Sequence, residues 1–283
     1  MPNLNSLKNR INVVTNTQKI TNAMELVSTA KLRRLRNEYE KIAAYHETLS
    51  STFEDLISHI DKTDFELVFP KNTSKNKLHI LISSDLGLCG SYNHNVYKLL
   101  ETAIQPEDKI VVIGTKGFTL LKSSKYKNQI LMSFINVGDQ VSYEIGNKIT
   151  QESLKLYFNN KISEIVLYYT EFVNNLVQNP VSLTLFPFNL DNKKSKIDSS
   201  VIEFEPNAET VLLNSVPLYL ASMIFSLGSN SKISEMASRR NAMENATNNA
   251  EDLIENLKLE FNRERQSIIT QEITEIVAGA DAT

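Results

Sequence analysis

Glycine and proline are scarce in this chain of 283 residues, which has eight glycines and seven prolines. Neither residue occurs between Asn3 and Phe69, nor between Ser229 and Ala278. These are the two residue types that break helices most strongly, whereas an average globular helix has only about eleven or twelve residues. The two stretches therefore predict two helices of unusual length, one at each end of the chain.

Cysteine and long apolar runs are also nearly absent. The one cysteine, Cys89, excludes a disulfide within the chain and favours a reducing compartment. No run approaches the eighteen apolar residues of a membrane-spanning helix, and the N-terminus shows no apolar signal-peptide core. We therefore expect any membrane association to be peripheral and made through other proteins. The formal net charge of -3 argues against a general nucleic-acid binder.

No arrangement of residues typical of catalysis or of cofactor binding occurs. The segment 114–117 (GTKG) lacks the spacing of a phosphate-binding loop, so we interpret it as a strand-to-helix turn. Cys89 has no second cysteine for a C-x-x-C pair, and we interpret it as a small buried residue. The four histidines, at positions 46, 59, 79 and 94, show no metal-ligand spacing. The sequence predicts no catalytic residue, no cofactor and no metal.

Both glycine-free stretches carry an apolar stripe with steps of three and four residues, which is the seam of a coiled coil. The N-terminal stripe begins at Leu4, Leu7, Ile11 and Val14, continues out of phase at Ile20, Met24 and Val27, and resumes from Leu32 to Ile60. We interpret the phase changes as stutters that locally rewind a supercoil. The C-terminal stripe consists of Met243, Thr247, Ala250, Ile254, Leu257 and Phe261.

Each stripe is the simplest partner for the other, and the two helices then run antiparallel. At about 1.5 Å per residue, a helix of about 57 residues would be about 85 Å long, which exceeds the width of a small domain. The last helix is the longer one, so we expect its end to project alone. We predict an N-terminal helix at 1–65, an α/β domain at 70–205 and a C-terminal helix at 210–283.

The middle of the chain alternates between β-rich and helical segments. The expected strands are 78–82, 109–113, 130–135, 165–169 and 181–186, and the expected helices are 93–103, 115–122 and 143–159. Such alternation predicts a parallel or mixed sheet flanked by helices, and the polar segment 191–200 predicts an exposed loop. The predicted fold class is mixed α+β and α/β, a long antiparallel coiled coil with a Rossmann-like globular domain.

Three parts of the chain, at its start, middle and end, resemble the gamma subunit of F-type ATP synthases. They are 16–27 (NTQKITNAMELV) with 31–33 (KLR), then 84–90 (SDLGLCG), and finally 237–243 (ASRRNAM) with 262–280 (NRERQSIITQEITEIVAGA). They occur in the family's order and the total length matches, so the resemblance covers nearly the whole chain. The family usually has a second glycine where Ser91 stands, and Tyr92 and His94 are less typical of it.

The resemblance implies a central-stalk rotor that does no chemistry itself. In the family, three alpha and three beta subunits form a hexameric collar around the coiled coil, and the globular part joins the epsilon subunit and the ring of c subunits. Proton-driven rotation of the ring is coupled to ATP synthesis or hydrolysis in the collar. The resemblance thus implies a non-catalytic subunit of a proton-transporting ATP synthase, peripheral on the cytoplasmic face of a bacterial membrane, without nucleic acid as a partner.

The resemblance also implies residue roles at three surfaces. Contact with beta subunits is implied for Met24, Lys31, Arg33, Arg34, Arg36, Arg265 and Gln266. An apolar bearing tip is implied for Ile268, Ile269, Ile273, Ile276 and Val277. Contact of the globular foot with epsilon or the ring is implied for Leu86, Leu88, Ser91, Tyr92 and Phe204. Without the resemblance, the charged positions are typical of solvated helix faces, and the apolar tip of a helix-dimerisation face.

Two other functions stay open at this point. The chain could be the shaft of a related rotary ATPase that is not coupled to a proton ring, or a coiled-coil adaptor that belongs to no motor. An adaptor would not need the apolar C-terminal tip. The subunits that copurify with the chain would separate these hypotheses.

Overall fold

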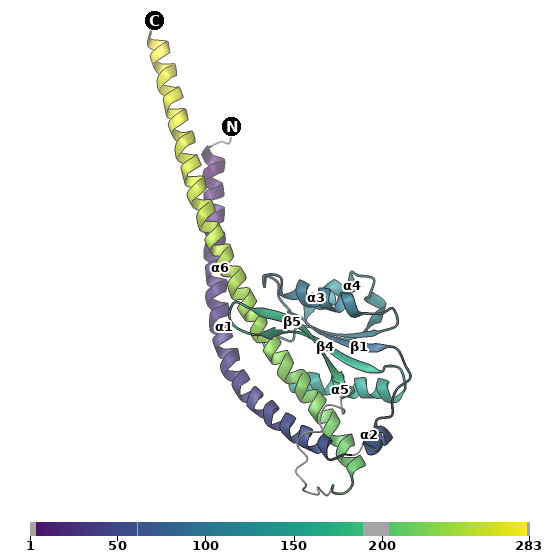
Figure 1. The fold of residues 1–283 in the computed structure, drawn as a ribbon. Helices are drawn as coiled ribbons and strands as arrows, with labels where there is room; N and C mark the ends of the chain where they lie inside the picture. The colour runs from purple at the N-terminus through teal and green to yellow at the C-terminus, as the bar shows by residue number, and fades with distance from the viewer. Residues whose placement is uncertain (1–3, 61, 189–203, 282–283) are drawn as a thin grey trace. The chain divides into compact units, whose positions relative to one another are not determined.

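The computed structural model describes residues 4–60, 62–188 and 204–281. The chain forms two compact units, which Figure 1 shows as ribbons. The coiled-coil unit consists of Met1–Thr29 and Arg239–Thr283, and the sheet unit consists of Ala30–Ser238. Both long helices are shared between the units, since α1 spans Leu4–Ser58 and α6 spans Ala208–Asp281.

The two units therefore differ from the three predicted segments 1–65, 70–205 and 210–283. The inner part of each long helix belongs to the sheet unit. The N-terminal helix also ends earlier than predicted, at Ser58, and a separate short helix α2 follows at Lys62–Val68. Length of helix alone does not show which part of a helix packs on a neighbouring domain.

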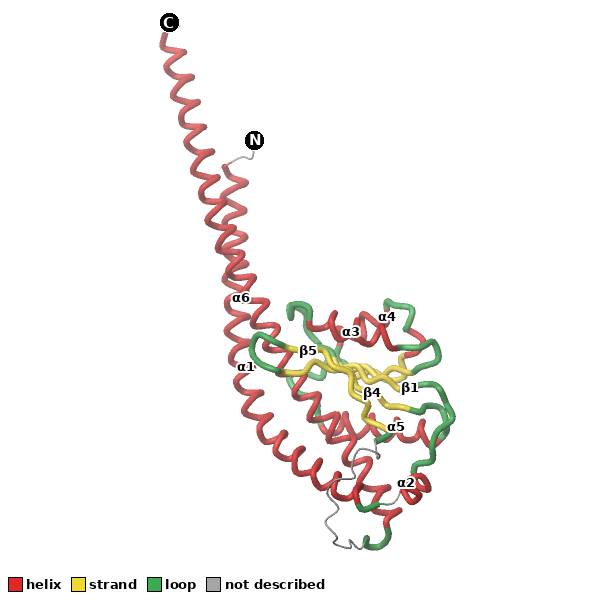
Figure 2. The backbone as a smooth tube through the Cα atoms, in the orientation of Figure 1, coloured by secondary structure: helices red, strands yellow, loops and turns green. Residues whose placement is uncertain are grey.

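In the coiled-coil unit the first part of α1 and the last part of α6 run antiparallel, side by side (Figures 1 and 2). The hydroxyl of Thr247 donates a hydrogen bond to the hydroxyl of Thr21 at 2.8 Å, which marks the register. The helix α6 has 74 residues and α1 has 55. Because the two helices rise equally per residue, this register places Leu4 level with Glu264. The predicted antiparallel coiled coil with a longer C-terminal helix is confirmed.

The seam of α1 in the coiled-coil unit keeps one phase. Its buried and half-buried positions include Leu7, Ile11, Val14, Gln18, Thr21, Glu25 and Ser28. Ile20 and Val27, in contrast, are 60% and 56% exposed. The predicted stutters are therefore wrong. The sequence interpretation followed the apolar side chains, whereas the regular turn of the helix brings polar side chains into the seam.

The seam of α6 in the same unit agrees with the prediction. All six predicted positions are buried or half-buried, and they are Met243, Thr247, Ala250, Ile254, Leu257 and Phe261. Steps of four and three residues keep them on one stripe facing α1. Here the apolar pattern and the helix pitch agree, so the pattern alone was sufficient.

The sheet unit contains a five-stranded mixed sheet. The strands are β1 (Lys77–Ile82), β2 (Lys109–Ile113), β3 (Ile130–Phe134), β4 (Glu164–Phe172) and β5 (Gln178–Phe186). Their order is β3-β2-β1-β4-β5, and only the pair of β4 with β5 is antiparallel. All five predicted strands are present, and the predicted mixed sheet is confirmed.

Helices cover both faces of this sheet. On one face lie α3 (Tyr92–Ala103) and α4 (Thr115–Lys122), and on the other lie α5 (Tyr143–Phe158) and α6 (Figures 1 and 2). A single 3₁₀ turn, η1, at Lys127–Gln129 precedes β3. The layers follow from the period of two along each strand, which sends successive side chains to opposite faces.

Strand β1 shows how the two hydrophobic cores arise. Ile80 and Ile82 join the core beneath α5 and α6, whereas Leu81 joins the core beneath α3 and α4. Every one of these side chains is fully buried. A strand covered on both faces has an almost continuous apolar run rather than an alternating one, as β1 and β2 do.

The inner part of α6 lies in the larger of these cores. Its apolar residues Leu212, Val216, Leu220 and Ile224 recur at every fourth position and pack there. Pro217 lies inside the helix, nine residues after its start, where it removes one backbone hydrogen bond.

One helix, within the described residues, is long and apolar enough to cross a membrane by length and composition. It is the part Ala208–Ala278 of α6, whose most apolar window has a mean hydropathy of 1.6 and is 44% buried inside the protein. The expectation from the sequence considered only unbroken apolar runs and did not identify it. Because apolar residues of α6 pack in the core of the sheet unit, a core helix accounts for this composition.

Candidate functional site

The carboxyl ends of the parallel strands meet at one edge of the sheet. In the order β3-β2-β1-β4-β5, successive connections run to opposite sides of the boundary between β1 and β4. Such a boundary, at the carboxyl ends of the strands, is where open α/β sheets usually bind a ligand. The segment 83–91 leaves β1 at this edge, and Asp85 lies within it.

In this protein the chain's own helix α6 occupies that edge. The backbone N–H of Thr170 in β4 donates to the Ser231 hydroxyl at 3.1 Å, and that of Phe172 donates to the Asn230 side-chain oxygen at 2.8 Å. The Tyr92 hydroxyl, at the start of α3, is 2.8 Å from the Ser231 hydroxyl. We call this contact the helix–sheet junction. It uses backbone groups that the end of a strand leaves without a ladder partner.

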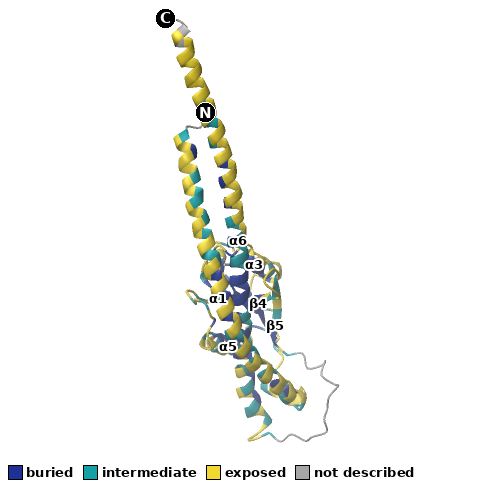
Figure 3. Ribbon diagram, turned by 90° about the vertical axis from the view of Figure 1, so that its left-hand side faces the viewer, coloured by how far each residue is buried: buried dark blue, intermediate teal, exposed yellow. Residues whose placement is uncertain are grey.

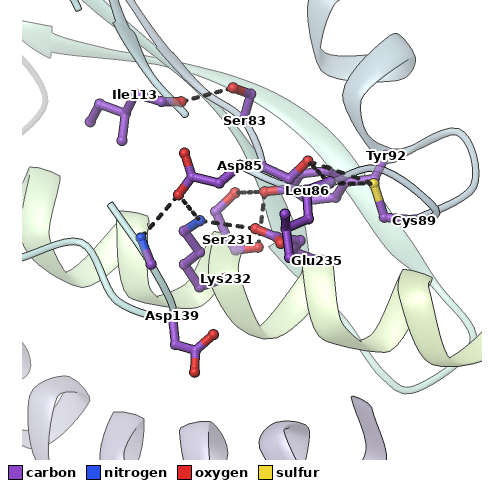
Figure 4. Close-up of polar contacts among 12 residues, drawn as sticks. Ser83, Asp85, Leu86, Cys89, Tyr92, Ile113, Asp139, Ser231, Lys232 and Glu235 are labelled. Atoms are coloured by element: carbon purple, nitrogen blue, oxygen red, sulfur yellow. Dashed lines mark hydrogen bonds and ion pairs between the residues drawn. The ribbon is translucent and has the colours of Figure 1, made fainter. Parts of the chain in front are cut away.

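A buried lysine lies at the centre of the junction. The side chain of Lys232 is 1% exposed, and its ammonium lies 3.0 Å from a Glu235 carboxylate oxygen and 4.0 Å from an Asp85 carboxylate oxygen (Figure 4). Glu235 is also buried. An ammonium removed from water needs such partners, because an isolated buried charge costs several kcal/mol.

Asp85 connects this ion pair to the loops at the ends of three strands. Its carboxylate accepts hydrogen bonds from the Thr115 hydroxyl at 2.7 Å and from the backbone N–H groups of Thr115, Asn136 and Gly138 at 2.9–3.0 Å. Burial on its own would raise the pKa of Asp85, but these hydrogen bonds and the charge of Lys232 hold that pKa below its ordinary value. The carboxylate is therefore kept charged.

The turn after β2 brings its backbone close to the loop that follows β1. Gly114 has a φ of +102°, and a Cβ atom there would lie 2.3 Å from the Ser83 carbonyl oxygen. Only glycine fits such an approach. The predicted strand-to-helix turn at 114–117 is confirmed, because Gly114 directly precedes α4.

The junction has the features of a joint rather than of a reaction site. Its charged groups are matched with one another, and its central lysine is inaccessible to solvent. Cys89 is buried nearby and accepts a hydrogen bond from the Asn93 amide at 3.2 Å. In the described part of the chain, no cluster of three or more acidic, histidine or cysteine side chains could hold a metal ion. Buried ionic networks of this kind can fix one orientation between packed elements.

A second buried polar cluster lies under α3 and α4. The His79 ring contacts the Asp108 carboxylate at 2.9 Å and the Tyr168 hydroxyl at 3.1 Å. Burial raises the pKa of Tyr168 to about 12, with a further contribution from the charge of Asp108. Burial would also raise the pKa of Asp108, but hydrogen bonds, first that with His79, lower it below its ordinary value. The cluster is enclosed and cannot reach a substrate, so it stabilises the fold.

The basic cluster on α1 is partly neutralised within the sheet unit. Lys31 and Arg34 bind the Asp139 carboxylate at 2.7 Å and 2.9 Å. The Arg36 guanidinium lies 5.6 Å from the centre of the Phe172 ring. Arg33 is exposed and, among the described residues, forms no ion pair. Two of the four cations predicted to contact a beta subunit thus already have an acidic partner in this chain.

The end of α6 carries the predicted bearing residues. Ile268 is half-buried, whereas Ile269, Ile273, Ile276 and Val277 are between 45% and 72% exposed. Figure 3 shows this end exposed on all sides, beyond the start of α1. Arg265 and Gln266 are also exposed, just before it, and Met24 is half-buried on α1. The structure therefore leaves the apolar tip without cover from the described chain.

The predicted foot residues fall into different environments. Leu86, Leu88 and Ser91 are exposed, and Phe204 is half-buried. Tyr92, in contrast, is 3% exposed and its hydroxyl binds Ser231. Its predicted role as a contact with epsilon or the ring is therefore corrected. Tyr92 belongs to the helix–sheet junction.

Residues 3–283 match the protein family described as ATP synthase. The ATP synthase gamma chain of Mycoplasmopsis synoviae is 48% identical, over the full length of both chains. That of Clostridium botulinum is 39% identical, over 98% of this chain and 96% of the relative. The chain belongs to the ATP synthase gamma-chain family.

Solved structures agree with the gamma-chain fold. A chain of the Euglena gracilis mitochondrial ATP synthase, in an assembly with OSCP, F1 and the c-ring, matches with a TM-score of 0.70. The match covers 99% of this chain and 94% of that one, at 17% identity. A chain of the Tetrahymena thermophila central stalk and c-ring has a TM-score of 0.59 over 80% of this chain, at 24% identity. At these identities the likeness concerns the fold.

Sequence reasoning found the exposed parts of this gamma chain and missed its junction. The helix tip is visible in a sequence as apolar residues beyond the end of a partner helix. Asp85 and Lys232 are 147 positions apart, and each resembles an ordinary surface charge. One signal was available: Lys232 stands in a stretch of α6 that is otherwise rich in serine and small residues, where a solvated helix face would carry more charges.

Proposed function

We propose that this gamma chain is the rotor shaft of an F-type ATP synthase that is coupled to a proton-driven ring. In this function the coiled-coil unit turns inside a collar of alpha and beta subunits, and the sheet unit binds the epsilon subunit and the ring of c subunits. The chain carries no catalytic residue of its own and serves a complex of the proton-translocating class. It lies on the cytoplasmic face of a bacterial membrane, held there through the other subunits.

One observation carries this proposal: α6 is held by polar contacts in the sheet unit, and its C-terminal end is exposed to solvent. In the sheet unit it is held by hydrogen bonds from β4 and by the buried Lys232. In the coiled-coil unit it ends in exposed apolar side chains. A shaft needs both properties, since torque enters where the helix is clamped and the free end must turn against another surface. Apolar contact is non-directional and so suits such a surface.

The coiled-coil unit is also asymmetric in charge. Its α1 part carries Lys8, Arg10 and Lys19 against Glu25, whereas its α6 part, 239–281, has nine acidic and five basic residues. A turning rod with unlike sides presents a different surface to each surrounding subunit. Differential contact of this kind is what shifts a conformational equilibrium.

Arg265 and Gln266 are proposed to bind a loop of a beta subunit. Both are exposed on the α6 side of the coiled-coil unit, just before the bare tip. A guanidinium can donate two parallel hydrogen bonds to a carboxylate. Replacing Arg265 by alanine is therefore expected to impair coupling or assembly, without changing the nucleotide affinity of an isolated beta subunit.

Copurification tests the function directly. An affinity-tagged chain, expressed in its own cells, is expected to bring down alpha, beta, epsilon and c subunits from detergent-solubilised membranes. Recovery of alpha and beta without c subunits would favour a rotary ATPase that drives another load. Recovery of neither would favour the coiled-coil adaptor and would contradict the proposal.

Truncation tests the bearing. Removal of residues 269–283 is expected to weaken the bearing and lower the torque of a reconstituted complex, while the sheet unit stays folded. The matched comparison replaces Ile273 and Ile276 by serine in one variant, and Gln271 and Thr274 by alanine in the other. Only the first pair should reduce rotary turnover, because only it removes apolar contact. Normal torque after a deletion back to Glu251 would count against the mechanism.

A further inference from the structure

The loops that lead into the parallel strands of the sheet unit are rich in lysine. Each of four segments ends at the first residue of a strand, and together they contain eight lysines and three acidic residues. These segments are 71–77, 104–109, 122–130 and 158–164. The loops 83–91 and 135–142, at the opposite, carboxyl edge, contain two aspartates and neither lysine nor arginine. The whole chain has a net charge of -3, so this excess of positive charge is local.

Two of the three acidic residues in these segments are already paired. Asp108 is buried and contacts His79, and Glu164 binds Lys77 at 2.7 Å. Six of the lysines, in contrast, are exposed and form no ion pair within the described residues. We call these six the lysine edge, and they are Lys75, Lys109, Lys122, Lys125, Lys127 and Lys161.

The lysine edge is continuous across four strands. Because β1, β2, β3 and β4 are parallel, their amino ends meet at one edge of the sheet. The Ser74 hydroxyl donates to the Lys161 carbonyl oxygen at 3.1 Å, and the Gln129 amide donates to the Pro106 carbonyl oxygen at 2.8 Å, so neighbouring loops touch. Strands lie about 4.8 Å apart, so the four strands span about 15 Å.

Stabilisation of helix ends does not account for all of these lysines. Lys122 lies in the last turn of α4, where a cation favours the helix macrodipole. Lys75 precedes β1 and Lys109 begins β2, and neither lies in the last turn of a helix. The lysines follow a row and do not converge on one point. Such a row suits a surface that carries many phosphate groups rather than one small anion.

Two exposed apolar side chains lie beside the lysine edge. Leu67 of α2 is 81% exposed, and Phe158, three residues before Lys161, is 49% exposed. The ring of Phe158 stacks on that of Phe69 with 5.5 Å between the ring centres, which joins α2 to the end of α5. Lysines with exposed apolar neighbours are typical of proteins that bind the surface of a membrane. A nucleic acid would also attract the lysines, but Leu67 offers no ring on which a base stacks.

We propose that the lysine edge, with Leu67 and Phe158 beside it, binds the phosphate groups of anionic membrane lipids. This inference rests on the proposed function, which brings the chain to a membrane. It adds a direct contact with lipid to the attachment through other subunits. Charge attraction of this kind acts over about 10 Å at 0.1 M salt and needs no fixed geometry. The sheet unit is thus held near the lipid surface without being locked at one angle of rotation.

Sedimentation of the purified full chain with lipid vesicles tests this inference. The vesicles consist of phosphatidylcholine with or without phosphatidylglycerol, and the measured quantity is the partition coefficient of the chain. The test variant replaces Lys75, Lys109 and Lys161 by glutamine. The matched control replaces three exposed lysines away from the edge by glutamine, so that both variants lose the same charge: Lys41, Lys148 and Lys258.

We expect the native chain to prefer the vesicles that contain phosphatidylglycerol, and high salt to reduce this preference. The test variant should lower the partition coefficient at least about tenfold and the control less than about twofold. Leu67→Ser should lower it about threefold, whereas Leu176→Ser should leave it unchanged. Leu176 is a matched control because it is also 81% exposed but lies in the loop between β4 and β5, at the carboxyl edge.

Equal binding of the native chain and the test variant would overturn the inference. Release of the chain by inorganic phosphate at constant ionic strength would assign the edge to free phosphate and overturn it too. Tighter binding to an RNA oligonucleotide than to the vesicles, at equal phosphate concentration, would assign the edge to nucleic acid with the same consequence. None of these outcomes changes which subunits copurify with the chain, so failure of the lipid contact is distinguishable from failure of the proposed function.

Discussion

The two parts of α6 differ in how much of their surface the protein covers. Within the sheet unit, 221–237 is buried or half-buried at every position, although the segment includes serines, a lysine and a glutamate. Within the coiled-coil unit only one stripe of α6 is covered from Ala250 to Ile268, and beyond Ile268 every described side chain is exposed. One continuous helix thus passes from full enclosure to full exposure.

The difference shows that polarity alone does not decide where a helix is buried. The buried charged side chains of the sheet unit are paired, as Lys232 is with Glu235, whereas the buried hydroxyls of Ser222, Ser226 and Ser234 find no hydrogen-bond partner among the described residues. Small side chains also let α6 approach its neighbours closely: a Cβ atom on Gly146 of α5 would lie 2.6 Å from the Ala221 carbonyl oxygen. In the coiled-coil unit Gln18, Thr21 and Glu25 of the seam are half-buried and need less pairing, and the buried Ser28 hydroxyl donates to the Met24 carbonyl oxygen at 2.7 Å.

The largest expected effect comes from breaking the enclosed part. Replacing Lys232 by methionine should lower the free energy of unfolding of the sheet unit by about 3–5 kcal/mol, because Glu235 and Asp85 lose their buried counter-charge. Tyrosine fluorescence during urea unfolding measures this unit alone, since all ten tyrosines lie between Tyr39 and Tyr219 and there is no tryptophan.

Two further variants control the lysine experiment. Replacing the exposed Lys98 by methionine should change stability by less than about 0.5 kcal/mol. Adding Glu235→Gln to Lys232→Met should recover part of the loss, because it removes one of the two carboxylates that have lost the lysine. A Lys232→Met chain as stable as the native one would show that the ion network does not hold α6 on the sheet.

The close contact of α5 with α6 is the next way to disturb the enclosed part. Gly146→Ala should destabilise the sheet unit by about 1–3 kcal/mol, because the new methyl group would overlap the backbone of α6. Helix propensity on its own predicts the opposite sign, a gain of about 1 kcal/mol. Gly87→Ala is the matched control, since its Cβ would meet only the flexible Lys116 side chain at 3.5 Å. A gain in the stability of Gly146→Ala would exclude the close contact.

The pH dependence of stability examines the charge state of the junction. The folded-state pKa of Asp85 is lowered from its ordinary 3.8. Its stabilising contribution is therefore present above that value and is lost as the pH falls through the lowered pKa. Asp85→Asn should make the sheet unit less stable at pH 7 and should flatten the fall in its urea midpoint as the pH drops from about 5 to about 3.

Thr115→Val separates the hydrogen bond from the rest of the network. It removes the hydroxyl that donates to Asp85 at 2.7 Å, so the pKa of Asp85 should move back toward its ordinary value. The fall in the urea midpoint between pH about 5 and about 3 should then be flattened as in Asp85→Asn, but to a smaller extent. An unchanged slope in both variants would contradict the role assigned to this carboxylate.

The smallest expected effect lies in the coiled-coil unit and has the opposite sign. Replacing Thr21 and Thr247 together by valine removes both members of a half-buried polar pair and should be neutral or stabilise the coil by up to about 1 kcal/mol. This unit contains no tyrosine, so its unfolding is followed as the loss of helical circular dichroism that occurs without a change in tyrosine fluorescence. A clear loss of stability would mean that the seam depends on the threonine pair.

Much of the fold could be predicted because its signals are local. Strand β2 is a run of apolar β-branched residues between polar ones, and its predicted limits 109–113 are those observed. The missing glycines and prolines indicated both long helices. The phase of the α1 seam could not be predicted in the same way. Ile20 and Val27 are apolar residues at a spacing typical of a seam, but their side chains are exposed.

In the candidate site, too, features with local sequence signals could be predicted and features that depend on distant residues could not. The exposed tip could be predicted because it depends only on the unequal lengths of two paired helices and on the apolar residues at the end of the longer one. The pairing of Lys31 and Arg34 with Asp139 could not, since the partners are more than a hundred residues apart. The sequence pattern therefore described four free cations where the tertiary structure holds two of them.

By itself the sequence determined that this gamma chain has two long terminal helices, a mixed sheet between them and an apolar C-terminal end. These properties follow from backbone preferences and side-chain periodicity, which act within a few turns or along a single strand. Only the tertiary structure decided that α6 fills the ligand edge of the sheet, that Lys232 is buried there, and that α1 carries apolar residues on its outer side. Each of these depends on which distant groups share a space without water, because burial and pairing are properties of neighbours in space.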